Sequence, residues 1–222
     1  MLNSRFAIRT STQVIIKHDI GDHPRKGYLA PDGKIYYHMI PKNASSYLGG
    51  ILQDIGWQLI SDLADAHGRQ GLCLLREPLA RWISGITEFM HGIGMSADEV
   101  VKDWNALSKI LKAQPQQDAH TTPQIEFLHG MDLDSFDYAY MSEIISIGNL
   151  LYTYLNTRGY ENRIHRYERQ NTVDDHDEKR RIRDHIRTSI NEDVDFKQRI
   201  QHYYADDYAM IEWVGKTKGW IH

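Results

Sequence analysis

Short apolar runs bounded by turn residues dominate the first third of the chain. Residues 35–40 and 71–75 are apolar runs of this kind, and their length is typical of buried strands. Residues 57–60 predict a further strand. A Pro-Asp-Gly turn at residues 31–33 separates two strand-like runs and therefore predicts a hairpin. Further upstream, the β-branched residues of segment 12–18 predict one more strand.

Helical spacing of apolar residues appears between and after these runs. Residues 46–55 and 78–90 each follow a buried run, and Pro78 suits the first turn of a helix. Residues 96–113 carry apolar side chains three and four positions apart, which is the helical period. The same reasoning predicts helices at residues 142–157, 175–190 and 194–214, and strands at residues 136–141 and 162–165.

The order of these elements predicts the fold class. Strands that alternate with helices at this spacing are typical of βαβ units, so we expect an α/β protein with a central, mainly parallel sheet, an N-terminal hairpin and a helix-rich C-terminal half. The 222 residues suit one large domain, and no linker, repeat or low-complexity tract divides them. We expect a β-rich extension at residues 1–34 and a core at residues 35–214.

Composition narrows the functional classes. Hydrophobic residues make up 41% and charged residues 25%, which is ordinary globular usage and excludes collagen-like and disordered chains. A net charge of −4 disfavours broad nucleic-acid binding. No run approaches the roughly 20 apolar residues that span a bilayer, and the N-terminus lacks a signal-peptide core, so no membrane association is expected. The single cysteine, Cys73, indicates a reducing compartment, and we expect the cytoplasm.

The segment from residue 40 to 52 is the first candidate for a binding site. It joins a predicted buried strand to a predicted helix, where open α/β sheets bind ligands and where a helix N-terminus attracts anions. Lys42 supplies a positive charge, and small residues follow it, so that backbone amides can approach an anion: Asn43, Ala44, Ser45 and Ser46. The lysine precedes the loop, unlike that of a Walker A sequence. The alternative is an ordinary turn capped by a serine.

A second segment, residues 74–89, follows the next predicted strand and also leads into a helix. Arg76 at the strand end would reach the same rim of the sheet as Lys42, and Ser84 lies about two turns into the helix. Arginine forms forked bonds to phosphate, and serine adds a hydroxyl donor. Alternatively, Arg76 pairs with a carboxylate such as Glu77, and Ser84 is a small packing residue.

Several segments, in this order, resemble a known family. PKNASSYL is similar to the 5′-phosphosulfate loop, and REPLARWIS to the 3′-phosphate motif, of sulfotransferases that use 3′-phosphoadenosine 5′-phosphosulfate (PAPS). DAHTTPQIEFL resembles a segment of the carbohydrate sulfotransferases, the sulfotransferase family 2-like group. The likeness extends over about residues 35–213, and RYERQN departs from the family pattern.

The resemblance implies a three-layer, P-loop-like fold and transfer of a sulfuryl group from PAPS to an acceptor hydroxyl. It implies that Lys42 and residues 43–46 bind the 5′-phosphosulfate, with Lys42 also acting in catalysis, and that Arg76 and Ser84 bind the 3′-phosphate. His120 and Gln124 would contact the acceptor or anchor a loop. The family needs no metal. The acceptor would be a glycan or another small molecule with a hydroxyl group.

The acceptor must lose a proton, so a general base is required. The resemblance points to residues 61–70, where His67 is the first choice because the usual pKa of histidine suits a base near neutral pH. An exposed loop histidine without a catalytic role is the alternative. Further candidates for the base are Asp62, Asp65, Glu88 and His91.

Two other functions use the same anion site. One is a P-loop kinase that binds ATP and magnesium, although neither a Walker A lysine nor a magnesium-binding acidic residue stands out. The other is a nucleotide-binding protein without catalytic activity. The sequence leaves the acceptor and the oligomeric state open.

Overall fold

A computed structural model describes residues 26–61, 63–141, 147–160 and 177–221. The chain forms two compact units. The sheet unit contains the described residues of Met1–Arg76, Gln124–Gln170 and Ala209–His222, and the helical unit contains those of Glu77–Pro123 and Asn171–Tyr208. The single domain expected from the sequence stays a prediction.

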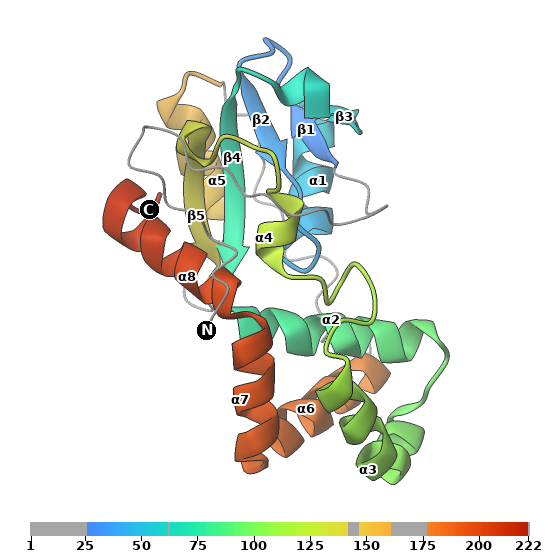
Figure 1. Cartoon of the computed structure of the whole chain (residues 1–222). Helices are drawn as coiled ribbons and strands as arrows, with labels where there is room; N and C mark the ends of the chain where they lie inside the picture. Colours follow the sequence, from blue (N-terminus) through green and yellow to red (C-terminus); the bar gives the residue numbers. More distant parts are fainter. Residues whose placement is uncertain (1–25, 62, 142–146, 161–176, 222) are drawn as a thin grey trace. The chain divides into compact units, whose positions relative to one another are not determined.

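The sheet unit is built on five strands (Figure 1). Their order across the sheet is β3 (Gln58–Ile60), β1 (Gly27–Leu29), β2 (Ile35–His38), β4 (Gln70–Arg76) and β5 (Phe136–Met141). β2, β4 and β5 pair in parallel, but β1 is antiparallel to both β2 and β3. The protein is therefore α/β as expected, while the sheet is mixed instead of mainly parallel. The hairpin at residues 31–33 explains the difference, because it reverses β1 against β2.

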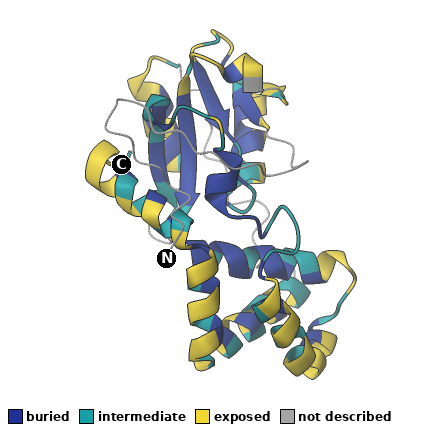
Figure 2. Ribbon diagram, viewed as in Figure 1, coloured by how far each residue is buried: buried dark blue, intermediate teal, exposed yellow. Residues whose placement is uncertain are grey.

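Helices cover both faces of this sheet. Alternate residues of β4 point to opposite faces, as in any strand: Leu72 and Leu74 pack with α1 (Ser45–Asp54) and α5 (Ile147–Thr157). Cys73 and Leu75 pack in a second cluster with α4 (Gln124–Phe127) and with Met210 and Val214 near the C-terminus. Figure 2 shows β2, β4 and α4 as buried. The continuous apolar run of β4 thus reflects burial on two faces.

The helical unit packs four helices around an apolar core that includes Trp82, Ile86, Ile186 and Phe196. These helices are α2 (Pro78–Gly92), α3 (Ala97–Ala113), α6 (Asp177–Glu192) and α7 (Val194–Tyr203). The highly charged α6 buries only its stripe of Ile182, Ile186 and Ile190, which are four residues apart. Most of its charged residues lie outside this buried stripe and form a solvated face.

Most predicted elements are present within a few residues of their expected ends. The exception is the helix expected at residues 194–214, which is divided into α7 and α8 (Ala205–Trp213) at Tyr204. No glycine or proline marks this division; instead, the buried Tyr204 hydroxyl donates a hydrogen bond to the Thr121 carbonyl. The strands predicted at residues 12–18 and 162–165, and the first part of the helix predicted at 142–157, lie outside the described residues.

None of the helices in the described part of the chain is both long enough and apolar enough to cross a membrane.

Candidate anion-binding site

The turn from β2 into α1 has an unusual backbone. Lys42 has a φ angle of 67° and Ala44 one of 56°, and they are the two non-glycine residues with positive φ in the described ranges. Such values are uncommon for residues with a Cβ atom. Asn43 between them has a negative φ, so the sign of φ alternates along the turn. Alternation between left- and right-handed backbone can turn successive N–H groups toward one side and form a concavity that attracts anions. The Asn43 N–H itself donates to the Ile40 carbonyl at 3.2 Å, so the amides that remain for an anion are those that follow it.

The N-terminus of α1 directly continues this turn. The first helical bond runs from the Leu48 amide to the Ala44 carbonyl, so the amides of residues 45–47 precede the regular hydrogen-bond pattern. No side chain caps this end, and no acidic residue lies in the first turn. The hydroxyls of Ser45 and Ser46 have no hydrogen-bond partner among the described residues. The helix dipole and these donors therefore favour a bound anion.

A buried amide fixes the turn to the neighbouring strand. The Asn43 side chain is fully buried, and its Nδ2 atom donates to the Leu74 carbonyl and to Gln124 Oε1, both at 2.7 Å. Its Oδ1 atom accepts no hydrogen bond within the described chain. Gln124, also buried, accepts a bond from the Arg76 amide at 3.0 Å and donates one to the Arg76 carbonyl at 2.9 Å. The turn, the end of β4 and the start of α4 thus share one polar network.

Arg76 brings a second positive charge to this turn. Its Nη1 atom donates to the Lys42 carbonyl at 2.9 Å. β2 and β4 are parallel neighbours, so their carboxyl ends meet at one edge of the sheet, which is where α/β sheets bind ligands. A guanidinium has five N–H donors, so one side chain can both support a loop and bind an anion. The structure thus brings together Lys42, Arg76 and the small residues 43–46, as the sequence predicted.

No family model matches the chain, and no curated protein or solved structure is significantly similar to it.

Ser84 and His120 both belong to the helical unit, where they lie close together. Gly85, next to Ser84 in α2, has no room for a Cβ atom because the carbonyl group of His120 lies against it. The His120 side chain bonds through Nδ1 to Asp118 Oδ2 at 2.8 Å. Burial raises the pKa of Asp118, but hydrogen bonds from His120 and Thr121 outweigh this, and the pKa is lowered. The carboxylate therefore stays ionised near neutral pH and orients the imidazole.

The structure does not bring His67 to the anion site. His67 is exposed and precedes β4, whereas Arg76 ends β4. The seven residues of β4, which Figure 1 shows as one continuous strand, span about 20 Å. His67 and Asp65 precede this strand and Arg76 ends it, so they lie at opposite ends of β4. Asp62 lies outside the described residues. Glu88 and His91 are in α2, where Glu88 forms an ion pair with Lys179 at 3.0 Å.

Two features of the site were missed by sequence reasoning. One is the burial of the Asn43 side chain, which bonds to β4 and Gln124, whereas the sequence reasoning considered only the small size of Asn43 and its backbone amide. The other is His38, whose Nε2–H donates to the Phe127 carbonyl at 2.9 Å while Nδ1 accepts a bond from Tyr36. This bond fixes α4 to β2. The position of His38 inside the apolar run at residues 35–40 was the one sequence feature that could have predicted this buried hydrogen bond.

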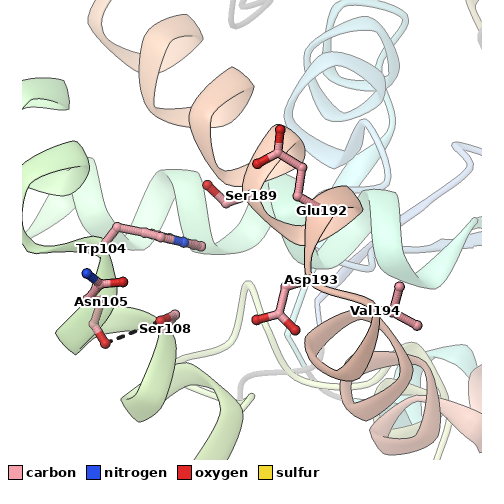
Figure 3. Close-up of a pocket in the computed structure, with 7 residues that line it drawn as sticks. All are labelled: Trp104, Asn105, Ser108, Ser189, Glu192, Asp193 and Val194. Carbon is pink, nitrogen blue, oxygen red and sulfur yellow. Dashed lines mark hydrogen bonds between the residues drawn. The ribbon is translucent and has the colours of Figure 1, made fainter.

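An open groove in the helical unit offers different chemistry (Figure 3). It has a volume of about 570 Å³ and is lined by Trp104, Asn105, Ser108, Ser189, Glu192, Asp193 and Val194. The lining contains two carboxylates and no lysine or arginine, although Lys112 pairs with Asp193 at 2.7 Å. This groove therefore does not suit a phosphate or sulfate group.

The described residues contain no group of three or more histidine, cysteine, aspartate or glutamate side chains placed to hold a metal ion.

Proposed function

We propose that the protein is a PAPS-dependent sulfotransferase that transfers a sulfuryl group to an acceptor hydroxyl. The observation that supports this most is the turn at residues 41–44. A lysine, a backbone whose φ alternates in sign and a helix N-terminus without a side-chain cap occur together there, and Arg76 is bonded to the same turn. The residues of this turn are also those of the PKNASSYL segment, which resembles the 5′-phosphosulfate loop of these enzymes.

The proposed reaction is an in-line displacement at sulfur. The acceptor oxygen forms a bond to sulfur, the bond between sulfur and the bridging 5′-phosphate oxygen breaks, and the acceptor proton passes to a base. Adenosine 3′,5′-bisphosphate leaves with more negative charge on its 5′-phosphate. Lys42 and the amides at the start of α1 stabilise this charge as it develops, and fixed donors of this kind provide a large part of many rate enhancements.

Arg76 and Ser84 are proposed to bind the 3′-phosphate, which distinguishes PAPS from ATP. His120 is proposed to contact the acceptor, and the acceptor is proposed to be a glycan or another small hydroxyl compound. His67 is not carried into this proposal as the base, because it lies at the opposite end of β4 from Arg76. Among the described residues, the base then stays open between Glu88 and His91, with Asp65 excluded by the same geometry as His67.

We propose that the protein works without a metal and in the cytoplasm. The one cysteine, Cys73, is fully buried and unpaired, and burial raises the pKa of its thiol. A buried, protonated thiol of this kind has no need of an oxidising compartment.

The proposal is tested by thermal melting with adenosine 3′,5′-bisphosphate and, separately, with ATP plus magnesium. A ligand at 100 times its Kd stabilises by about 2.7 kcal/mol, which corresponds to a shift of about 5–10 °C for a chain of this size. We expect this shift with the bisphosphate and little change with ATP. Equal shifts with both would favour the kinase.

Activity is tested by incubation with PAPS labelled in its sulfuryl group and a panel of sugars and phenols. Transfer of label to at least one hydroxyl compound is the expected result. Binding of the bisphosphate without transfer to any panel member would favour a nucleotide-binding protein that lacks a working base.

A further inference from the structure

We infer that Gln124 is a positioning residue that fixes the turn at residues 41–44 in its anion-binding conformation. The choice of ligand in the test below rests on the proposed function, but the hydrogen-bond geometry from which Gln124 is inferred to position the turn does not. Gln124 is 81 residues away from Asn43 in the sequence, yet the two side chains share a hydrogen bond of 2.7 Å in the sheet unit. The binding of an anion by this turn would therefore depend on a side chain that does not touch the anion.

The Gln124 amide bonds to the end of β4 as a neighbouring strand would. Its Oε1 atom accepts a bond from the Arg76 amide at 3.0 Å, and its Nε2 atom donates to the Arg76 carbonyl at 2.9 Å. Only a side chain with both a donor and an acceptor can make this pair. A glutamate of the same shape would place a carboxylate against the Arg76 carbonyl and would have no N–H to donate.

The same Oε1 atom extends the pair to the turn. It accepts a bond from Asn43 Nδ2, which also donates to the Leu74 carbonyl. Asn43 and Gln124 are almost completely excluded from solvent, so water cannot replace a lost partner without opening the structure. The bonds therefore determine the position of Asn43, and Asn43 lies between the two positive-φ residues, Lys42 and Ala44.

The position of Gln124 is itself determined by α4. Ile125, Phe127 and Leu128 are buried in the apolar cluster on one face of the sheet, and the Phe127 carbonyl accepts the bond from His38. Non-glycine residues with positive φ persist only where their surroundings enforce them. Gln124, the first residue of the anchored helix α4, provides that enforcement, while Arg76 bonds to the Lys42 carbonyl from the end of β4.

The test compares wild type, Gln124→Glu and the control Gln58→Glu, which makes the same change at an exposed position of β3 in the same unit. Amide hydrogen exchange of residues 42–48 reports the turn, and calorimetry reports binding of adenosine 3′,5′-bisphosphate. For Gln124→Glu we expect exchange at residues 42–48 to quicken and affinity to fall, each at least about tenfold, as is common when a supporting partner of a ligand-binding group is lost. In Gln124→Glu, amide exchange in α5 should not change, and in the control Gln58→Glu, neither the exchange of residues 42–48 nor the affinity should change.

A double-mutant cycle separates positioning from a general loss of stability. If Gln124 acts through the turn, combining Gln124→Glu with Lys42→Ala should weaken binding by less than the product of the two single effects. Both changes would then impair the same anion-binding turn. Multiplicative effects would contradict the inference. So would unchanged exchange at residues 42–48 in a folded Gln124→Glu variant.

The exchange measurement remains decisive if wild type does not bind the ligand or if Gln124→Glu does not fold. If wild type does not bind the bisphosphate, the proposed function fails, and the exchange comparison still decides whether Gln124 positions the turn. If Gln124→Glu does not fold, Asn43→Asp takes its place, since it removes the two Nδ2 bonds from the other end of the network. Normal exchange at residues 42–48 in that variant would overturn the inference.

Discussion

Two neighbouring parallel strands, β2 and β4, each lead into a helix, but the two helix starts differ. At the start of α1 no side chain caps the amides, no acidic residue is present and the preceding backbone is left-handed. At the start of α2, Pro78 removes one N–H group and the Glu77 carboxylate accepts a bond from the Ala80 amide at 2.5 Å. A helix N-terminus alone is therefore no anion site. The start of α1 favours an anion because no side chain of the protein caps it and no acidic residue lies in its first turn, whereas the start of α2 already binds the carboxylate of Glu77.

Lys42→Ala should have the largest effect, because it removes the positive charge from the first start. We expect sulfuryl transfer to fall by about 10²–10³-fold, the range seen when one donor to a developing anion is lost. The melting shift with adenosine 3′,5′-bisphosphate should disappear. Lys34→Ala is the matched control, since Lys34 lies before β2 and pairs with Asp32 at 3.3 Å. Equal losses in both variants would mean that the turn has no special role.

Ser46→Glu would make the start of α1 resemble the start of α2, because it adds a carboxylate to the first turn of the helix. A carboxylate in the first turn interacts favourably with the helix dipole and should raise the free energy of unfolding of the ligand-free protein by about 0.3–1 kcal/mol. It should also repel the bisphosphate and weaken binding at least about tenfold, since like charges would share one site. Urea unfolding and calorimetry measure the two effects. Binding that stays intact would place the anion elsewhere.

The two helices also differ in how closely other segments approach them. In α2, a Cβ atom on Gly85 would collide with the His120 carbonyl. Gly85→Ala should therefore destabilise the protein by about 1–3 kcal/mol, as overpacking usually does. The measurement is urea unfolding followed by circular dichroism. A neutral or stabilising result would show that the 118–122 segment is not held against α2.

Glu77→Ala removes the cap of the second start. The loss of a capping side chain costs about 0.5–2 kcal/mol, and the bond from the Tyr208 hydroxyl to Glu77 at 2.5 Å is lost with it. Bisphosphate affinity should not improve, because Pro78 still lacks an N–H group to offer. A gain in affinity comparable to the loss in Lys42→Ala would make the second start an anion site after all.

Gly50→Ala gives the smallest effect. Gly50 is an exposed residue within α1, and a Cβ atom there would meet nothing within 4 Å. Alanine should stabilise the helix by about 0.5–1 kcal/mol. Melting curves with and without bisphosphate measure this change and should show the same ligand shift as wild type. Destabilisation would contradict the open surroundings of this glycine.

The sequence was informative wherever local chemistry decides structure. The Pro-Asp-Gly turn predicts the β1–β2 hairpin, and the apolar runs predict β2 and β4, so the meeting of Lys42 and Arg76 at one sheet edge could be foreseen. The antiparallel placement of β3 beside β1 could not, because strand order depends on long-range pairing. The resemblance suggested Gln124 as an acceptor contact or a loop anchor, but nothing near residue 124 identifies Asn43 as its partner. The resemblance pointed to the window that contains His67, but His67 precedes the apolar run at residues 71–75 and Arg76 follows it, so the sequence already indicated that the two lie at opposite ends of β4.

The most direct test follows the backbone amides by nitrogen–proton NMR during titration with adenosine 3′,5′-bisphosphate. The amides of Ser45 and Ser46 and that of Arg76 should shift most, in proportion to bound ligand, and Lys42→Ala should abolish these shifts. Shifts confined to the groove beside Trp104, or no shifts up to the highest soluble ligand concentration, would contradict an anion site at the turn into α1.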